Sequence, residues 1–213
     1  MLARGSAPHP SASFFEERFG VTREQMKKIL EIALSKGGDF SELYFEYKIS
    51  NSVRMEEDII KDSSESITLG VGIRVLKGAQ TGYGYTDDLS YERMKQTALT
   101  AAAIAAGNSG IKVADLTQKM SPLQVYDLKT PMQGVLLASK ADLVKQAYTA
   151  AQSHDRRITK VQAGLMDEIQ YITIANSEGL LVSDARPQVM MVVSSTAEDK
   201  GVRNTGFKTA GGR

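Results

Sequence analysis

The spacing of hydrophobic residues changes several times along this chain, and each change marks an expected element. From Met26 to Leu34 the apolar residues recur at helical spacing, Thr22 and Gln25 match a capping box before them, and Gly37-Gly38 follow. From Ser41 onward apolar and polar residues alternate, first through 43–49 and later through 67–75, the longest alternation in the chain. The chain therefore begins with a predicted helix followed by half-buried strands.

Turn and cap residues divide this first region further. We expect the chain to reverse near Asn51-Ser52 and again at 77–80, where Lys-Gly-Ala-Gln leads into a strand at 81–86. Ser90 is placed to cap a helix that continues to about Ala106. A strand meander flanked by two helices predicts a two-layer α+β unit.

A second unit is expected after 111–131, a stretch with two prolines and little periodicity. Ser139 to Asp142 predicts the start of a helix that buries Leu143 and Ala147, and strands are expected at 158–166, 170–175, 180–185, 188–196 and 202–207. The predicted fold class is α+β, built of two-layer units of antiparallel or mixed sheet packed with helices. We divide the chain into a flexible leader (1–13), an N-terminal α+β domain (14–110), a linker (111–131) and a second α+β segment (132–213).

Composition narrows the function classes. The 213 residues hold 26 Lys and Arg against 25 Asp and Glu, so the concentrated basic surface of a nucleic-acid-binding protein is not expected. No apolar run approaches the roughly 18 residues that span a bilayer, so no membrane contact is expected. Cysteine is absent, which excludes disulfides and thiolate chemistry, and together with the lack of a signal peptide this predicts a cytoplasmic protein.

Candidate metal and catalytic residues are few. His9 and His154 have no local set of partners, whereas a zinc site needs three or four convergent ligands. Glu56, Glu57, Asp58 and Asp62 lack the spacing of a calcium loop and are expected to form a solvated turn between strands. We therefore predict no catalytic residue and no metal site within this chain.

Glycines and tyrosines supply a different candidate. Five glycines, Gly70, Gly72, Gly78, Gly82 and Gly84, interleave with strand residues, which excludes a phosphate loop and favours close packing within the protein; a peptide lying across the same face is the alternative. Nearby, one arginine and three tyrosines are candidates for a surface that faces a partner subunit or a peptide, with ordinary cross-strand packing as the alternative. These residues are Tyr44, Arg74, Tyr83 and Tyr85.

Five short segments carry a family resemblance. They are G-D-F-S-E-L-Y-F-E-Y (38–47), L-G-V-G-I-R-V (69–75), T-G-Y-G-Y-T-D-D-L-S (81–90), D-A-R-P (184–187) and G-G-R (211–213). In this order the segments resemble the amino-terminal portion of the TldD branch of the TldD/PmbA family, once called modulators of DNA gyrase and regarded as zinc metallopeptidases.

The resemblance implies the rest of the functional prediction. Family members hold zinc with an H-E-x-x-x-H motif and a later cysteine, and neither occurs here. The resemblance thus implies a scaffold and dimerisation portion of a metallopeptidase that degrades or trims unfolded peptides, leading toward a C-terminal catalytic domain that this chain lacks. Zinc is expected only in the full-length protein, and the expected assembly is a homodimer or a heterodimer with a TldE/PmbA-like subunit. A stand-alone, non-catalytic binding or assembly module of the same fold remains the alternative.

Overall fold

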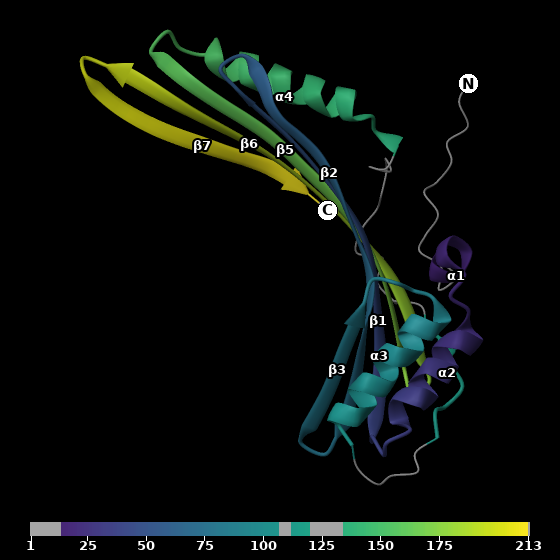
Figure 1. The fold of residues 1–213 in the computed structure, drawn as a ribbon. Coiled ribbons are helices and arrows are strands. Elements are labelled where there is room, and N and C mark those ends of the chain that lie inside the picture. Colours follow the sequence, from purple (N-terminus) through teal and green to yellow (C-terminus); the bar gives the residue numbers. More distant parts are fainter. Residues whose placement is uncertain (1–13, 107–111, 120–133, 213) are drawn as a thin grey trace, which may run out of the picture.

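The structure is a computed structural model that describes residues 14–106, 112–119 and 134–212. Its described strands form one seven-stranded sheet in the order β3-β2-β1-β5-β6-β4, and β7 also pairs with β6 (Figure 1). The short contact between β4 and β6 is parallel, and the other pairings are antiparallel. The strands are β1 (Phe40–Glu56), β2 (Ile59–Lys77), β3 (Gln80–Thr86), β4 (Thr117–Gln118), β5 (Ile158–Asn176), β6 (Leu180–Asp199) and β7 (Val202–Gly212).

β1 and β5 form the centre of the sheet and join the two parts of the chain. They pair antiparallel from Glu42 opposite Asn176 to Glu56 opposite Gln162. Strands from both predicted units therefore share one sheet, and the predicted α+β class is confirmed. The division into domains stays a prediction, since the leader (1–13) and most of the linker (111–131) lie outside the described residues.

The four described helices pack against two halves of this sheet. α1 (Phe14–Phe19), α2 (Arg23–Leu34) and α3 (Tyr91–Ile104) cover one half, and α4 (Leu137–Gln152) covers the other (Figure 1). None of these helices is long and apolar enough to cross a membrane.

The buried apolar residues form two clusters, one with α1, α2 and α3 and one with α4, and both lie on the same face of the sheet. On β1 the residues buried under α1 and α2 include Leu43 and Phe45, and those buried with α4 are Val53 and Met55. All four are odd-numbered positions of one strand, and alternate side chains of a strand share a face. The opposite face of the sheet is covered by no described helix.

Several local predictions are confirmed. The capping box is present: Thr22 Oγ1 accepts a hydrogen bond from the Gln25 backbone N–H at 3.2 Å, and Gln25 Oε1 accepts one from the Thr22 backbone N–H at 3.0 Å. The turn between Lys77 and Gln80 joins β2 to β3 as expected. α3 begins directly after Ser90, although the Ser90 side chain makes no capping hydrogen bond.

The expected reversal near Asn51-Ser52 was wrong. β1 runs without interruption through both residues, and the turn lies at Glu57-Asp58, which have φ angles of 53° and 61°. Polar residues occur at this point because this part of β1 lies between the two apolar clusters, and not because the chain turns. Asn51 faces this gap and donates a hydrogen bond from Nδ2 to Asp167 Oδ1 at 3.1 Å.

The second unit also differs from its predicted detail. The four strands expected between 158 and 196 are two long strands, β5 and β6. α4 begins at Leu137, before the predicted start, and Leu143 is exposed instead of buried. The buried stripe of α4 is Lys140, Val144 and Tyr148, at a spacing of four residues. A buried lysine heads this stripe, which hydrophobic spacing alone does not indicate.

Candidate interaction surface

Tyr83 and Tyr85 lie across glycines of the neighbouring strand on the face that the described helices leave uncovered. A side chain added at Gly72 would place its Cβ 2.5 Å from Tyr83 Oη, and one at Gly70 would collide with the Tyr85 ring. Tyr85 Oη donates a hydrogen bond to the Leu69 carbonyl at 3.1 Å. Each tyrosine is still 57% exposed, so each ring presents a flat aromatic surface to its surroundings.

The other two glycines of this region face the helices. A Cβ at Gly84 would lie 2.8 Å from a methyl carbon of Thr97, and one at Gly82 would collide with the Ala101 carbonyl oxygen, both on α3. These glycines allow the helix to approach β3 closely. The prediction of close packing is confirmed for these two glycines and for Gly70 and Gly72. It was wrong for Gly78, which lies in the turn between β2 and β3 with a φ of 54° and would have no atom within 4 Å of an added Cβ.

Arg74 and Tyr44 complete the predicted surface. In the strand register Arg74 lies opposite Tyr83, and Tyr44 lies opposite Gly72. Arg74 Nη2 lies 3.0 Å from Glu42 Oε1, which fixes the guanidinium beside the tyrosines. Burial raises the pKa of half-buried Tyr44, and the negative charge of Glu46 adds to the rise. The structure thus brings the four predicted residues together on three adjacent strands, as an aromatic surface with one partnered cation.

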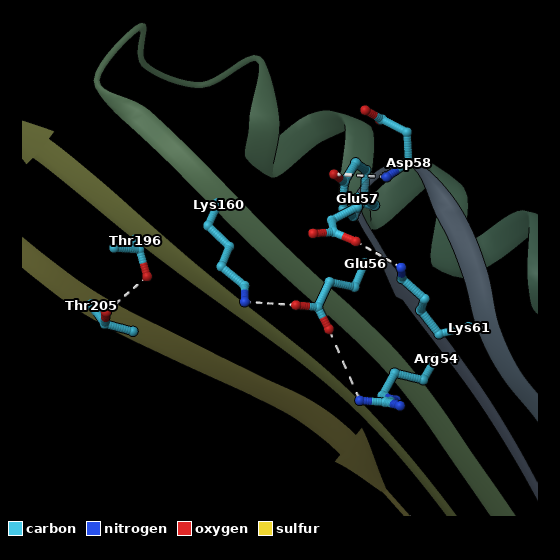
Figure 2. Close-up of polar contacts among 9 residues, drawn as sticks. Arg54, Glu56, Glu57, Asp58, Lys61, Lys160, Thr196 and Thr205 are labelled. Carbon is cyan, nitrogen blue, oxygen red and sulfur yellow. Dashed lines mark hydrogen bonds and ion pairs between the residues drawn. The ribbon is translucent and has the colours of Figure 1, made fainter.

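Two carboxylates at the end of β1 and in the turn that follows, Glu56 and Glu57, each form an ion pair with a different lysine (Figure 2). Glu56 Oε1 lies 2.6 Å from Lys160 Nζ, whereas Glu57 Oε2 lies 2.6 Å from Lys61 Nζ. Hydrogen bonds from Lys160 and then Gln162 lower the pKa of Glu56. Glu57 and Asp58 form the predicted turn between strands, whereas Glu56 is the last residue of β1 and Asp62 lies within β2.

The described part of the chain contains no candidate metal site. Across residues 14–106, 112–119 and 134–212, no group of three or more His, Cys, Asp and Glu could hold a metal ion. His154 is exposed after α4, and His9 lies outside the described residues.

Sequence reasoning missed a buried ion pair between α4 and the sheet. Lys140 Nζ donates a hydrogen bond to Asp167 Oδ1 at 2.9 Å and lies 2.8 Å from Oδ2 as an ion pair. The two side chains are only 4% and 2% exposed. The sequence carries two signals of this pair. Lys140 is spaced with the apolar positions of α4, and Asp167 lies in the middle of β5.

Comparison with known structures defines the class of fold. A proposed modulator of a DNA gyrase from Thermotoga maritima superposes with a TM-score of 0.71 at 19% identity, over 89% of this chain and 43% of that one. TldE from Thermococcus kodakarensis gives a TM-score of 0.66 at 16% identity, over 88% and 42%. At these identities the likeness shows a shared fold.

Sequence comparison identifies the family. Residues 41–105 match the PmbA/TldA metallopeptidase domain 1, and residues 131–213 match the PmbA/TldA metallopeptidase central domain. The chain belongs to the PmbA/TldD family.

Curated relatives carry the same family name. The metalloprotease TldD homolog of Buchnera aphidicola subsp. Acyrthosiphon pisum is 31% identical over 86% of this chain and 38% of its own length. The metalloprotease TldD homolog of Haemophilus influenzae is 28% identical over 91% and 40%. This chain therefore spans about two-fifths of the length of these relatives.

Proposed function

We propose that this chain is the amino-terminal scaffold and dimerisation portion of a TldD-like zinc metallopeptidase that degrades or trims unfolded peptides in the cytoplasm. The observation that carries the proposal is the collinear match to two successive domains of the family, at 41–105 and 131–213. The names of the curated relatives, metalloprotease TldD homologs, support the same assignment.

The described residues do not fit a zinc site, since no cluster of metal-ligating side chains occurs among them. The residues that the structure describes are therefore assigned no catalytic step. In the proposed protein, zinc and the reacting groups belong to a further domain, and this chain supplies rigid walls and subunit contacts.

The surface formed by Tyr44, Arg74, Tyr83 and Tyr85 is the proposed contact with a peptide or a partner subunit. Rings with an apolar body and a polar tip are favoured where one protein surface meets another. The partner is a second copy of the protein or a TldE/PmbA-like subunit, and TldE is among the proteins that share the fold. Nucleic acid and membrane are not proposed as partners.

Purification of the protein from its own cells tests the proposal. We expect zinc near one equivalent, cleavage of a carboxymethylated, unfolded protein, and loss of cleavage on treatment with a zinc chelator. Replacing Tyr83 and Tyr85 with alanine should weaken assembly or raise the KM, while phenylalanine at both positions should preserve the ring contacts. Cleavage that survives complete zinc removal would contradict the proposal.

A stand-alone binding or assembly module of the same fold is the second candidate. The lack of a metal-ligand cluster in the described residues is the observation that keeps it open. The two functions predict different native masses, because the curated relatives are more than twice as long as this chain.

A further inference from the structure

β7 is a long edge strand with exposed side chains along its whole length. It pairs with β6 from Asp199 opposite Val202 to Val189 opposite Gly212, and no other described strand pairs with it. Every residue of β7 is exposed, including Phe207 at 78% and Val202 at 62%. Figure 1 shows the β6–β7 hairpin at the margin of the sheet, away from α1, α2 and α3. An unpaired edge of this kind is a template for adding another strand.

The turn at Lys200-Gly201 determines which backbone groups face outward. Both residues have positive φ, 51° and 82°, as in a two-residue type I′ turn. Such a turn closes on a hydrogen-bonded pair, here Asp199 and Val202, and the pairs then alternate along the ladder. The outward N–H and C=O groups therefore belong to positions 203, 205, 207 and 209.

Side-chain contacts across the hairpin agree with this assignment. Non-hydrogen-bonded pairs bring opposite side chains closest together. Thr196 and Thr205 hydroxyls lie 2.8 Å apart, as drawn in Figure 2, and Arg203 Nε donates to Glu198 Oε2 at 2.7 Å. Residues 203 and 205 thus belong to the set whose backbone groups point away from β6.

The charge of β7 identifies the chemistry of its partner. The strand contains Arg203 and Lys208 and no carboxylate. Arg203 is paired with Glu198, whereas no hydrogen bond or ion pair joins Lys208 to another described residue. A second copy of β7 brings no negative charge in any antiparallel register, and one register sets Arg203 against Lys208. A strand that carries a carboxylate complements this edge, and a second copy does not.

We propose that the free edge of β7 binds an extended, acidic peptide segment by strand addition. Main-chain hydrogen bonds to positions 203–209 provide the affinity, as in other cases of strand addition. Phe207 and Lys208 point to opposite faces, so the preferred segment carries an apolar residue next to a carboxylate. This proposal stands on the described strands and is independent of the peptidase activity proposed above.

Fluorescence anisotropy with a labelled T-V-T-F-E-V-T peptide tests the proposal on the 213-residue chain. Thr209→Pro removes one outward N–H and leaves the ladder to β6 intact, while Thr209→Ala is the matched control that keeps the N–H. We expect binding to the parent chain and to the alanine variant, with Kd raised about tenfold or more by proline, since strand addition depends on main-chain hydrogen bonds. Circular dichroism establishes that both variants are folded.

A charge exchange provides the second variant. Lys208→Glu should reverse the preference, so that T-V-T-F-K-V-T binds more tightly than the glutamate peptide, while Lys200→Glu in the turn should leave the preference unchanged. Absence of binding, or equal binding by the proline and alanine variants, would overturn the proposal. So would a chain that is dimeric with alanine and monomeric with proline but binds neither peptide, because a second copy then occupies the edge.

Discussion

Removing one partner of the buried Lys140–Asp167 ion pair should destabilise this protein more than a single change at an exposed position of α4. Lys140→Met keeps most of the side-chain volume and leaves the Asp167 carboxylate buried. Among the described residues the Asn51 amide is then its remaining side-chain hydrogen-bond donor. Because the Lys140 and Asp167 side chains are 4% and 2% exposed, water cannot replace the lost ammonium without local opening. Leaving one buried charge unpaired costs about 3–5 kcal/mol.

A double variant separates the cost of the unpaired carboxylate from the effect of losing the lysine itself. In the double variant Lys140→Met with Asp167→Asn, an uncharged amide faces Asn51, and no unpaired buried charge remains. We expect the double variant to recover more than half of the stability that Lys140→Met loses, because replacing both partners of a buried pair is often close to neutral. Lys145→Met is the matched control. Lys145 lies on the same helix with its side chain 55% exposed, and its Nζ is 3.8 Å from Asp142 Oδ1. An exposed pair of this kind contributes about 0–1 kcal/mol.

Urea unfolding followed by circular dichroism at 222 nm gives the free energy of unfolding for the four proteins. Hydrogen exchange then shows whether the loss lies in α4 and the adjoining part of β5, as the contacts of Lys140 require. A cost for Lys140→Met no larger than that of the Lys145 control would refute the reasoning. A double variant less stable than the Lys140 single variant would refute it as well.

Three further predictions follow from local geometry. Thr22→Ala should cost about 1 kcal/mol of the free energy of unfolding through the lost cap, and Ser90→Ala should cost less because Ser90 makes no capping hydrogen bond; thermal unfolding compares them. Gly82→Ala should destabilise by about 1–3 kcal/mol through collision with α3, while Gly164→Ala, whose nearest neighbour would lie 3.6 Å away, should be tolerated in urea unfolding. Folding lowers the pKa of Glu56 from 4.5, so its contribution to stability is present above that value and lost as pH falls below it. Glu56→Gln should therefore reduce the acid-induced loss of stability below pH 4.5, and an unchanged pH profile in urea titrations would contradict this.

Local rules were sufficient for much of the fold. The capping box of α2, the alternation that became β2 and the turn at 77–80 depend on residues close together in the sequence, and all three are confirmed. The strand break expected at Asn51 failed because the polar residue there is satisfied by a group 116 positions away. A local pattern cannot distinguish a polar turn from a polar residue that lies between two cores.

The functional features, too, could be predicted only in part from the sequence. Tyr83 and Tyr85 alternate with glycines, so their shared face could be read from spacing. The burial of Lys140 could not, because it depends on where α4 lies against β5 and on the position of Asp167 in the sheet. The outward-facing groups of β7 likewise follow from the hairpin register, which the sequence leaves open until β6 is known to be one continuous strand.

The measurement that most directly tests membership of a larger peptidase is the native mass and zinc content of the protein isolated from its own cells. A polypeptide more than twice the 23.2 kDa of this chain, carrying zinc and assembled as a dimer, is the predicted result. A zinc-free product near 23.2 kDa would contradict it and would favour a binding module that works without a catalytic domain.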